Sequence, residues 1–248
     1  SPESIDNLFN FTHALFNLPL DVKMKYHLKG TNGARGYTPY GIETALNKNV
    51  PDQKEFWHQG SCSNRDLPDN LTINELENFN DINSLYKEFE KLGIKILESI
   101  SNFNINFNAD LKEIAIDGNS VLRLLHYPPV DARKNDNRAH AHNDVNLITL
   151  LVGGNEGGLE ALDKKGNWVE CNCEKNEIIC NVGDMLEIIS NKKLRSTAHR
   201  VKTKNNEDKS RYSIPFFLHP RPEVILDPRT NLTANDFLNK RLSDIKLG

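Results

Sequence analysis

Two histidines and an aspartate are the residues of this sequence best suited to holding a metal ion. His142 and Asp144 lie two positions apart, and residues two apart on a β-strand project from the same face. His199, in the stretch 196–201, can supply a second imidazole. Two histidines and one carboxylate leave the opposite side of a metal open, which suits a non-haem Fe(II) site. An isolated His-x-Asp pair is common in strands that bind nothing, so the residues that follow it decide its meaning.

A candidate carboxylate anchor lies beyond the second histidine. Arg211 and Ser213 would share one face of a strand. An arginine can hold a carboxylate through two parallel hydrogen bonds, and a serine hydroxyl can add a third. An anchor of this kind is what a dicarboxylate cosubstrate of an iron enzyme would need.

The elements that must position these residues change in character after Asp117. Before it, apolar residues recur at helical spacing over 5–16 and 85–100, and residues 31–60 read as irregular. After it, short apolar runs separated by turn residues predict strands. These strands are expected at 121–127, 139–144, 147–152, 159–162, 168–171, 178–181, 185–189, 197–202 and 212–218. A last helix is expected from Ala234, with Thr233 and Asp236 as a capping pair.

No helix-length segment separates the predicted strands, so they favour a sandwich or barrel over parallel βαβ units. The fold class is therefore mainly β with flanking helices: a jelly-roll core, an N-terminal helical segment and a C-terminal helix. We expect the helical flank at residues 1–118, the core at 119–222 and the C-terminal helix at 223–248, as one structural unit.

Composition excludes several classes of protein. The 248 residues carry 31 Lys and Arg against 34 Asp and Glu, with no basic stripe of the kind that binds nucleic acid. The longest apolar run, 147–152, is far shorter than the ~20 residues that span a bilayer. The spacing of Cys62, Cys171, Cys173 and Cys180 is unlike a disulfide framework and favours reduced thiols. We expect a cytoplasmic monomer whose partner is a small molecule rather than nucleic acid or a membrane.

Taken in order and at their spacing, these residues resemble the isopenicillin N synthase-like family of Fe(II)/2-oxoglutarate-dependent dioxygenases. The resemblance rests on three motifs: His142-Asn143-Asp144, His199-Arg200-Val201 and Arg211-Tyr212-Ser213. Flanking stretches at 35–37, 54–57, 122–129, 181–184 and 211–220 match as well. The likeness covers nearly the whole chain and implies a double-stranded β-helix core.

The resemblance also implies roles. Fe(II) would bind His142, Asp144 and His199, and 2-oxoglutarate would be held by Arg211, Ser213 and Tyr127. With O₂, such an oxidoreductase hydroxylates, desaturates or cyclises a small organic molecule and releases succinate and CO₂. Arg123 and Phe217 are candidates for the substrate pocket.

Several alternatives stay open at this point. The chain has Leu125 where plant relatives commonly carry an asparagine, which leaves the mode of cosubstrate binding open. His140 shares strand parity with His142 and could be a ligand instead, although the family register favours His142. Arg123 could bind an acidic substrate or form a structural ion pair. Thr149, by its parity, is given no metal role.

The function has alternatives too. A cosubstrate-free Fe(II) oxidase of the isopenicillin N synthase type would use the same anchor for its substrate's carboxylate. A non-catalytic sensor would bind the metal and 2-oxoglutarate without turnover. A plain β-sandwich would carry the histidines and aspartate by accident.

Overall fold

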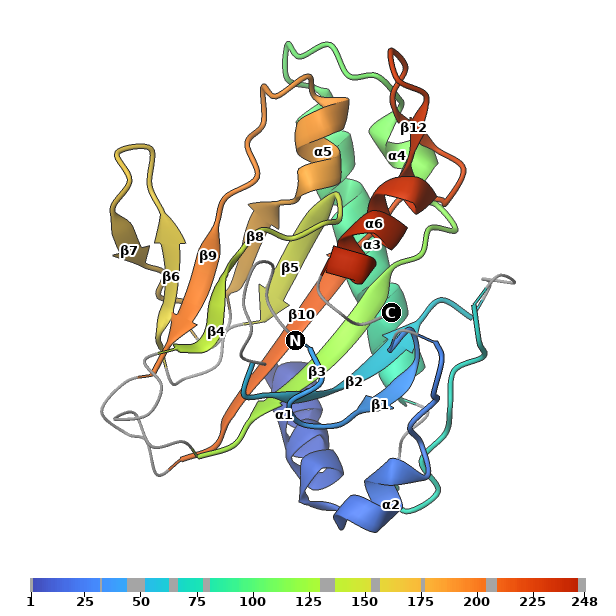
Figure 1. Ribbon diagram of the computed structural model, residues 1–248, viewed down its shortest axis with the longest axis vertical. Helices are drawn as coiled ribbons and strands as arrows, with labels where there is room; N and C mark the ends of the chain where they lie inside the picture. The colour runs from blue at the N-terminus through green and yellow to red at the C-terminus, as the bar shows by residue number, and fades with distance from the viewer. Residues whose placement is uncertain are drawn as a thin grey trace.

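The core of the molecule is a pair of antiparallel β-sheets that face each other (Figure 1). The computed structural model describes residues 2–31, 33–43, 52–62, 67–77, 81–129, 137–152, 157–174, 177–203 and 209–244. One sheet has six strands in the order β1-β2-β3-β10-β5-β8, and the other has four in the order β4-β9-β6-β7. Two facing antiparallel sheets make the jelly-roll-like core that the sequence predicted.

The six-stranded sheet brings together segments from both halves of the chain. Its strands are β1 (Gly36–Thr38), β2 (Glu55–Gly60), β3 (Val121–Tyr127), β5 (Ile148–Val152), β8 (Ile178–Val182) and β10 (Arg211–Leu218). The four-stranded sheet is made of β4 (Asn137–His142), β6 (Leu159–Leu162), β7 (Trp168–Glu170) and β9 (His199–Lys202). A small separate hairpin pairs β11 (Ile225–Asp227) with β12 (Leu232–Thr233).

Strand alternation divides the six-stranded sheet into a helix-covered face and a cavity face. On β10 the even-numbered residues are buried in the main core, whereas the odd-numbered residues line a cavity between the sheets. The core residues are Tyr212, Ile214, Phe216 and Leu218, and the cavity residues are Arg211, Ser213, Pro215 and Phe217. The period of two therefore places every candidate residue of this strand on one side.

Helices α1 (Pro2–Asn17) and α3 (Asp81–Ser101) pack against the sheet through buried apolar side chains. Phe89 of α3 stacks on Phe216 with ring centroids 5.7 Å apart. The remaining helices are α2 (Leu20–Met24), α4 (Leu111–Ala115), α5 (Asp184–Ile189) and α6 (Ala234–Asp244). The predicted cap of α6 is confirmed, since Thr233 Oγ1 accepts a 3.1 Å hydrogen bond from the Asp236 amide.

The structure corrects three local predictions. Residues 185–189, expected as a strand, form most of helix α5, because a short apolar run does not distinguish a buried strand from a buried helix. The segment 31–60, expected to be irregular, contributes β1 and β2 to the core sheet, so the N-terminal flank is not purely helical. The strand expected at 139–144 ends at His142, and Asp144 lies beyond it.

A buried polar cluster ties the N-terminal segment to the core. Glu55 of β2 accepts hydrogen bonds from Lys23 Nζ (2.8 Å), from the Tyr37 hydroxyl and from His126 Nδ1 (2.7 Å). These partners come from α2, β1 and β3, so one carboxylate joins four elements. A buried carboxylate needs such partners because desolvation would otherwise be costly.

Cys62 and Cys180 are exposed, and Cys171 and Cys173 are half-buried. Among the described residues, no helix is both long and apolar enough to cross a bilayer.

Candidate active site

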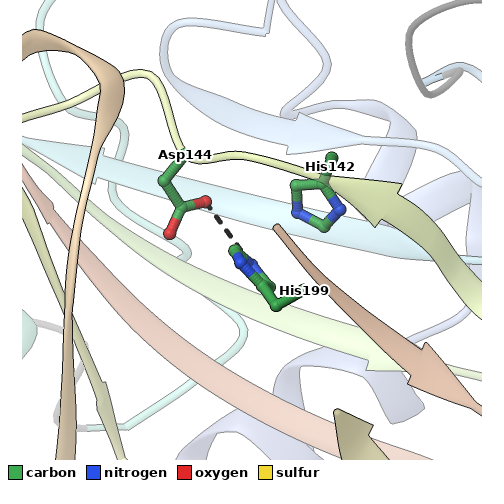
Figure 2. A group of neighbouring side chains, drawn as sticks. All are labelled: His142, Asp144 and His199. Carbon is green, nitrogen blue, oxygen red and sulfur yellow. Dashed lines mark ion pairs between the residues drawn. The ribbon is translucent and has the colours of Figure 1, made fainter. Parts of the chain in front are cut away.

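The His142, Asp144 and His199 side chains converge between the two sheets (Figure 2). His142 ends β4 and His199 begins β9, and the two residues are directly paired across these neighbouring strands. Asp144 follows in the loop after β4. One possible ligand atom from each residue lies within 4.8 Å of the others, and His199 Nε2 is 3.7 Å from Asp144 Oδ1. The three groups could therefore hold one metal ion.

The two imidazoles each commit one ring nitrogen to the backbone. His142 Nδ1 lies 2.7 Å from the carbonyl oxygen of His140, and His199 Nδ1 lies 3.2 Å from that of Thr197. A carbonyl only accepts, so Nδ1 carries a proton in both rings, and in the neutral form of each ring Nε2 has the lone pair that a metal needs. Burial and the neighbouring His199 lower the pKa of His142, which favours the neutral ring that a metal needs.

The Asp144 carboxylate is also hydrogen-bonded through only one of its two oxygen atoms. Its Oδ2 accepts hydrogen bonds from Thr149 Oγ1 (2.6 Å) and Asn181 Nδ2 (2.8 Å), and Oδ1 faces His199. Burial alone would raise the pKa of Asp144, but the two histidines and these hydrogen bonds lower it. The carboxylate therefore stays ionised and presents one oxygen to the metal position.

The segment after β8 wraps around the Asp144 loop. The Gly183 amide donates to the Leu147 carbonyl (2.9 Å), and the Asp184 amide donates to the Asp144 carbonyl (2.8 Å). A Cβ atom on Gly183 would lie 2.2 Å from the Asn146 carbonyl oxygen, so this close approach requires glycine. This packing accounts for the stretch 181–184 that the sequence singled out.

The cavity beside the triad collects all the side chains that the sequence proposed. Its lining includes the metal candidates His142, Asp144 and His199, the cosubstrate candidates Arg211, Ser213 and Tyr127, and the substrate candidates Arg123 and Phe217. Apolar residues from both sheets form much of the remaining wall: Leu125, Leu151, Leu159, Ala161, Ile179 and Val201.

Arg211 is a buried cation without a carboxylate partner in the described part of the chain. Its Nε donates to the Gly157 carbonyl (3.3 Å), and its guanidinium lies 5.5 Å from the centre of the Tyr127 ring. Its Nη1 is buried and has no hydrogen-bond partner among the described residues. Leaving such a donor unsatisfied is costly, so the site fits an incoming carboxylate. Ser213 lines the same cavity, two residues further along the strand.

Arg123 has a different environment on the other side of the cavity. Its Nη1 pairs with Glu43 Oε2 (3.1 Å), and its Nε donates to His58 Nε2 (2.5 Å). Its guanidinium lies 4.3 Å from the Phe56 ring centre and 5.2 Å from that of Phe217. Arg123 therefore forms the ion pair that was one of the two sequence alternatives, and it also lines the cavity.

His140 lies apart from the three converging side chains. Its Nδ1 is 2.8 Å from Asp52 Oδ1, and its own carbonyl oxygen accepts a hydrogen bond from His142 Nδ1. The register of β4 against β9 shifts between Ala139 and His142, which breaks the simple alternation that would have put His140 and His142 on one face.

Sequence reasoning missed the groups that support the site. Thr149 was set aside on parity, yet its hydroxyl contacts Asp144 across a loop. Asn181 stood in a matching stretch, but no pattern pointed to its target. Lys54 lines the cavity and pairs with Asp52 (2.9 Å) and Glu43 (3.4 Å). Only the folded chain brings these residues together.

Comparison with known proteins agrees with this geometry. Residues 118–220 match the 2OG-Fe(II) oxygenase superfamily, and residues 1–83 match the family described as non-haem dioxygenase in morphine synthesis N-terminal. The 2-oxoglutarate-dependent dioxygenase htyE of Aspergillus rugulosus is 29% identical over 92% of this chain and 77% of its own length.

Solved structures give the same result. A putative 2OG-Fe(II) oxygenase family protein from Caulobacter crescentus has a TM-score of 0.83 and 39% identity, covering 99% of this chain and 87% of that one. A Neurospora crassa protein, solved in complex with alpha-KG and thymine, has a TM-score of 0.82 and 26% identity, covering 98% and 84%. These relatives favour 2-oxoglutarate dependence over a cosubstrate-free oxidase. The chain belongs to the 2OG-Fe(II) oxygenase superfamily, and it is an Fe(II)- and 2-oxoglutarate-dependent oxidoreductase.

Proposed function

We propose that this enzyme hydroxylates a small organic molecule, with Fe(II) held by His142, Asp144 and His199 and 2-oxoglutarate anchored by Arg211 and Ser213. One observation carries the proposal: the unsatisfied buried Nη1 of Arg211 belongs to a residue that lines the same cavity as the three candidate ligands. We also place the chain in the isopenicillin N synthase-like group, on the order and spacing of its motifs.

The donor set fits Fe(II). Two imidazole Nε2 atoms and one carboxylate oxygen are free to bind, and three protein ligands leave open positions for a cosubstrate and O₂. Fe(II) held there would supply the activation of O₂, so that oxidation of 2-oxoglutarate to succinate and CO₂ would leave one oxygen atom in succinate and the other in the hydroxylated product.

The protein's own residues bind and orient the reactants. Arg211 offers a fixed fork of donors to the far carboxylate of 2-oxoglutarate, and Ser213 adds a hydroxyl donor from the same face of β10. Tyr127 is paired with Arg211 across β3 and β10 and lines the same cavity, which supports a contact between its hydroxyl and the same cosubstrate. The lowered pKa values of His142 and Asp144 favour the neutral ring and the ionised carboxylate that metal binding needs.

The walls of the cavity would limit the access of water. Leu125, Leu159 and Val201 are buried between the sheets and line the space next to the triad. An apolar wall protects a reactive oxidant from quenching by solvent.

Anaerobic equilibrium dialysis tests the assignment. We expect one Fe(II) per chain in the wild type, with binding lost in His142→Ala and Asp144→Ala and kept in the exposed-site control His13→Ala.

With Fe(II) present, Arg211→Ala should weaken 2-oxoglutarate binding by about 100-fold, because two charge-assisted hydrogen bonds disappear. Full iron binding in Asp144→Ala would overturn the metal assignment, and unchanged cosubstrate binding in Arg211→Ala would overturn the anchor.

A further inference from the structure

Two arginines line this cavity, and their electrostatic environments are opposite. Arg211 is buried with an unsatisfied Nη1 and no carboxylate partner in the described part of the chain. Arg123 instead pairs with Glu43 at 3.1 Å. A guanidinium with an unbalanced charge favours an anion, whereas one already paired with a carboxylate does not.

Arg123 is held rigidly in place. His58 Nδ1 lies 2.6 Å from the Gly33 carbonyl and carries the proton, so His58 Nε2 accepts the hydrogen bond from Arg123 Nε. The rings of Phe56 and Phe217 lie within cation–π distance of the guanidinium. These contacts use Nε and one hydrogen of Nη1. The remaining N–H groups of this preorganised side chain are free for a ligand, because no bond to Nη2 is formed within the described residues.

The neighbouring charges are already matched. Lys54, the other cation on this side of the cavity, has Asp52 at 2.9 Å and Glu43 at 3.4 Å. Among the described residues, this wall therefore sets two cations against two carboxylates. A substrate carboxylate on Arg123 would lie next to Glu43, and two carboxylates in one partly buried site repel each other.

We propose that Arg123 recognises the carbonyl oxygen of an uncharged substrate, such as an amide or lactam, and that Glu43 makes the site reject a carboxylate. This inference rests on the proposed function, since it assigns the substrate end of that same cavity. The sequence alone allowed Arg123 to bind an acidic substrate. The ion pair with Glu43 now favours an uncharged substrate instead. Phe217, which lines the cavity beside the guanidinium, offers an apolar surface to the body of the same molecule.

Matched pairs of small probes test the proposal. The protein is loaded with Zn²⁺, which holds the site without redox chemistry, and with saturating 2-oxoglutarate, which occupies Arg211. Dissociation constants of benzamide against benzoate, and of phenylacetamide against phenylacetate, are measured by ligand-observed NMR. We expect each amide to bind the wild type at least about tenfold more tightly than its acid.

Variants then separate the two residues. Glu43→Gln should reduce the amide-to-acid preference by at least about tenfold, because it removes the repelling charge. Arg123→Gln should weaken amide binding by about tenfold. Glu113→Gln and Arg229→Gln remove the same charges from exposed ion pairs and should keep the wild-type preference.

Equal or tighter binding of the acids to the wild type would overturn the proposal, and this comparison needs no variant to fold. Failure of both amides to bind, or an unchanged preference in Glu43→Gln, would overturn it as well. Binding of 2-oxoglutarate to wild type and Arg123→Gln is measured on the same samples. If 2-oxoglutarate fails to bind the wild type, the proposed function itself is wrong; if it binds but the preference is absent, only this inference is wrong.

Discussion

At the residue scale, one polar atom of each candidate ligand is hydrogen-bonded to the protein, and the second polar atom of that side chain is left for the metal. His142 and His199 commit Nδ1 to carbonyl groups, and Asp144 commits Oδ2 to Thr149 and Asn181. The candidate ligands were predictable, because their types and order form a recognisable pattern. Thr149 and Asn181 were not, because their hydrogen bonds depend on how a loop folds back.

Replacing Thr149 with valine should weaken metal binding without unfolding the protein. The change removes the hydroxyl that donates to Asp144 Oδ2 (2.6 Å) while keeping a β-branched shape. Loss of a partner that orients a ligand typically costs about 10–100-fold in metal affinity. The measurement is the Mn²⁺ dissociation constant by isothermal titration calorimetry.

Thr149→Ser restores the hydroxyl and should recover most of the affinity. Asn143→Leu is the matched control, because Asn143 lies between the two ligands but donates to Ser196 at an exposed position. Equal Mn²⁺ affinity in Thr149→Val and wild type would show that Thr149 does not position Asp144.

At the scale of elements, the turn from β8 into α5 acts as a brace for the Asp144 loop. Sequence patterns located β3, β5 and β10 closely, because alternation and flanking turn residues are local signals. They misjudged α5, whose few apolar residues fit either a strand or a helix. They missed β1 and β2. β2 joins the sheet by pairing with β3, and β1 joins it by pairing with β2, and the local sequence of this Gly- and Pro-rich segment does not indicate such long-range pairing.

Gly183→Ala tests this brace. The new Cβ would meet the Asn146 carbonyl oxygen at 2.2 Å and its side-chain oxygen at 2.4 Å, so the turn must shift. Overpacking of this kind costs about 1–3 kcal/mol of unfolding free energy. We expect that loss in urea unfolding, together with weaker Mn²⁺ binding.

The matched control is Gly93→Ala in α3, where the added Cβ meets only the movable side chains of Leu218 and Leu150 at 3.0 Å or more. It should leave Mn²⁺ affinity unchanged. If Gly183→Ala bound Mn²⁺ as tightly as the wild type, the turn would not be part of the metal site.

At the scale of the whole molecule, contacts between distant segments decide the chemistry. Glu43 reaches Arg123 across 80 positions, and Asp52 reaches His140 across 88. The fold class and the order of the halves followed from the pattern of elements and from the family resemblance. The ion pairs beside the cavity could not be predicted in this way, because no local sequence signal indicates that residues so far apart in the chain will pair.

The whole-molecule stability should fall on acidification. Burial lowers the pKa of His219 to about 4, with Arg123 adding to the lowering and Asp144 opposing it. Between this value and the unfolded value of about 6.5, the unfolded chain binds the extra proton, so stability is lost as the pH falls through that window. His219→Gln should reduce the loss in unfolding free energy between pH 7 and pH 5 by about 2 kcal/mol.

Urea unfolding of the metal-free protein at the two pH values measures this difference. His13→Gln, at an exposed position of α1, is the control and should keep the wild-type loss. If the free energy of unfolding depended on pH in the same way in His219→Gln and in the wild type, His219 would not be a cause of the loss of stability in acid.

The most direct test of the central claim is the conversion of 2-oxoglutarate to succinate in the presence of Fe(II), ascorbate and O₂. Slow turnover without added substrate is expected in the wild type. It should be absent in His199→Ala, which loses one of the three converging side chains. It should also be strongly reduced at limiting 2-oxoglutarate in Arg211→Ala, which loses the anchor. Succinate formation at the wild-type rate in His199→Ala would contradict the account.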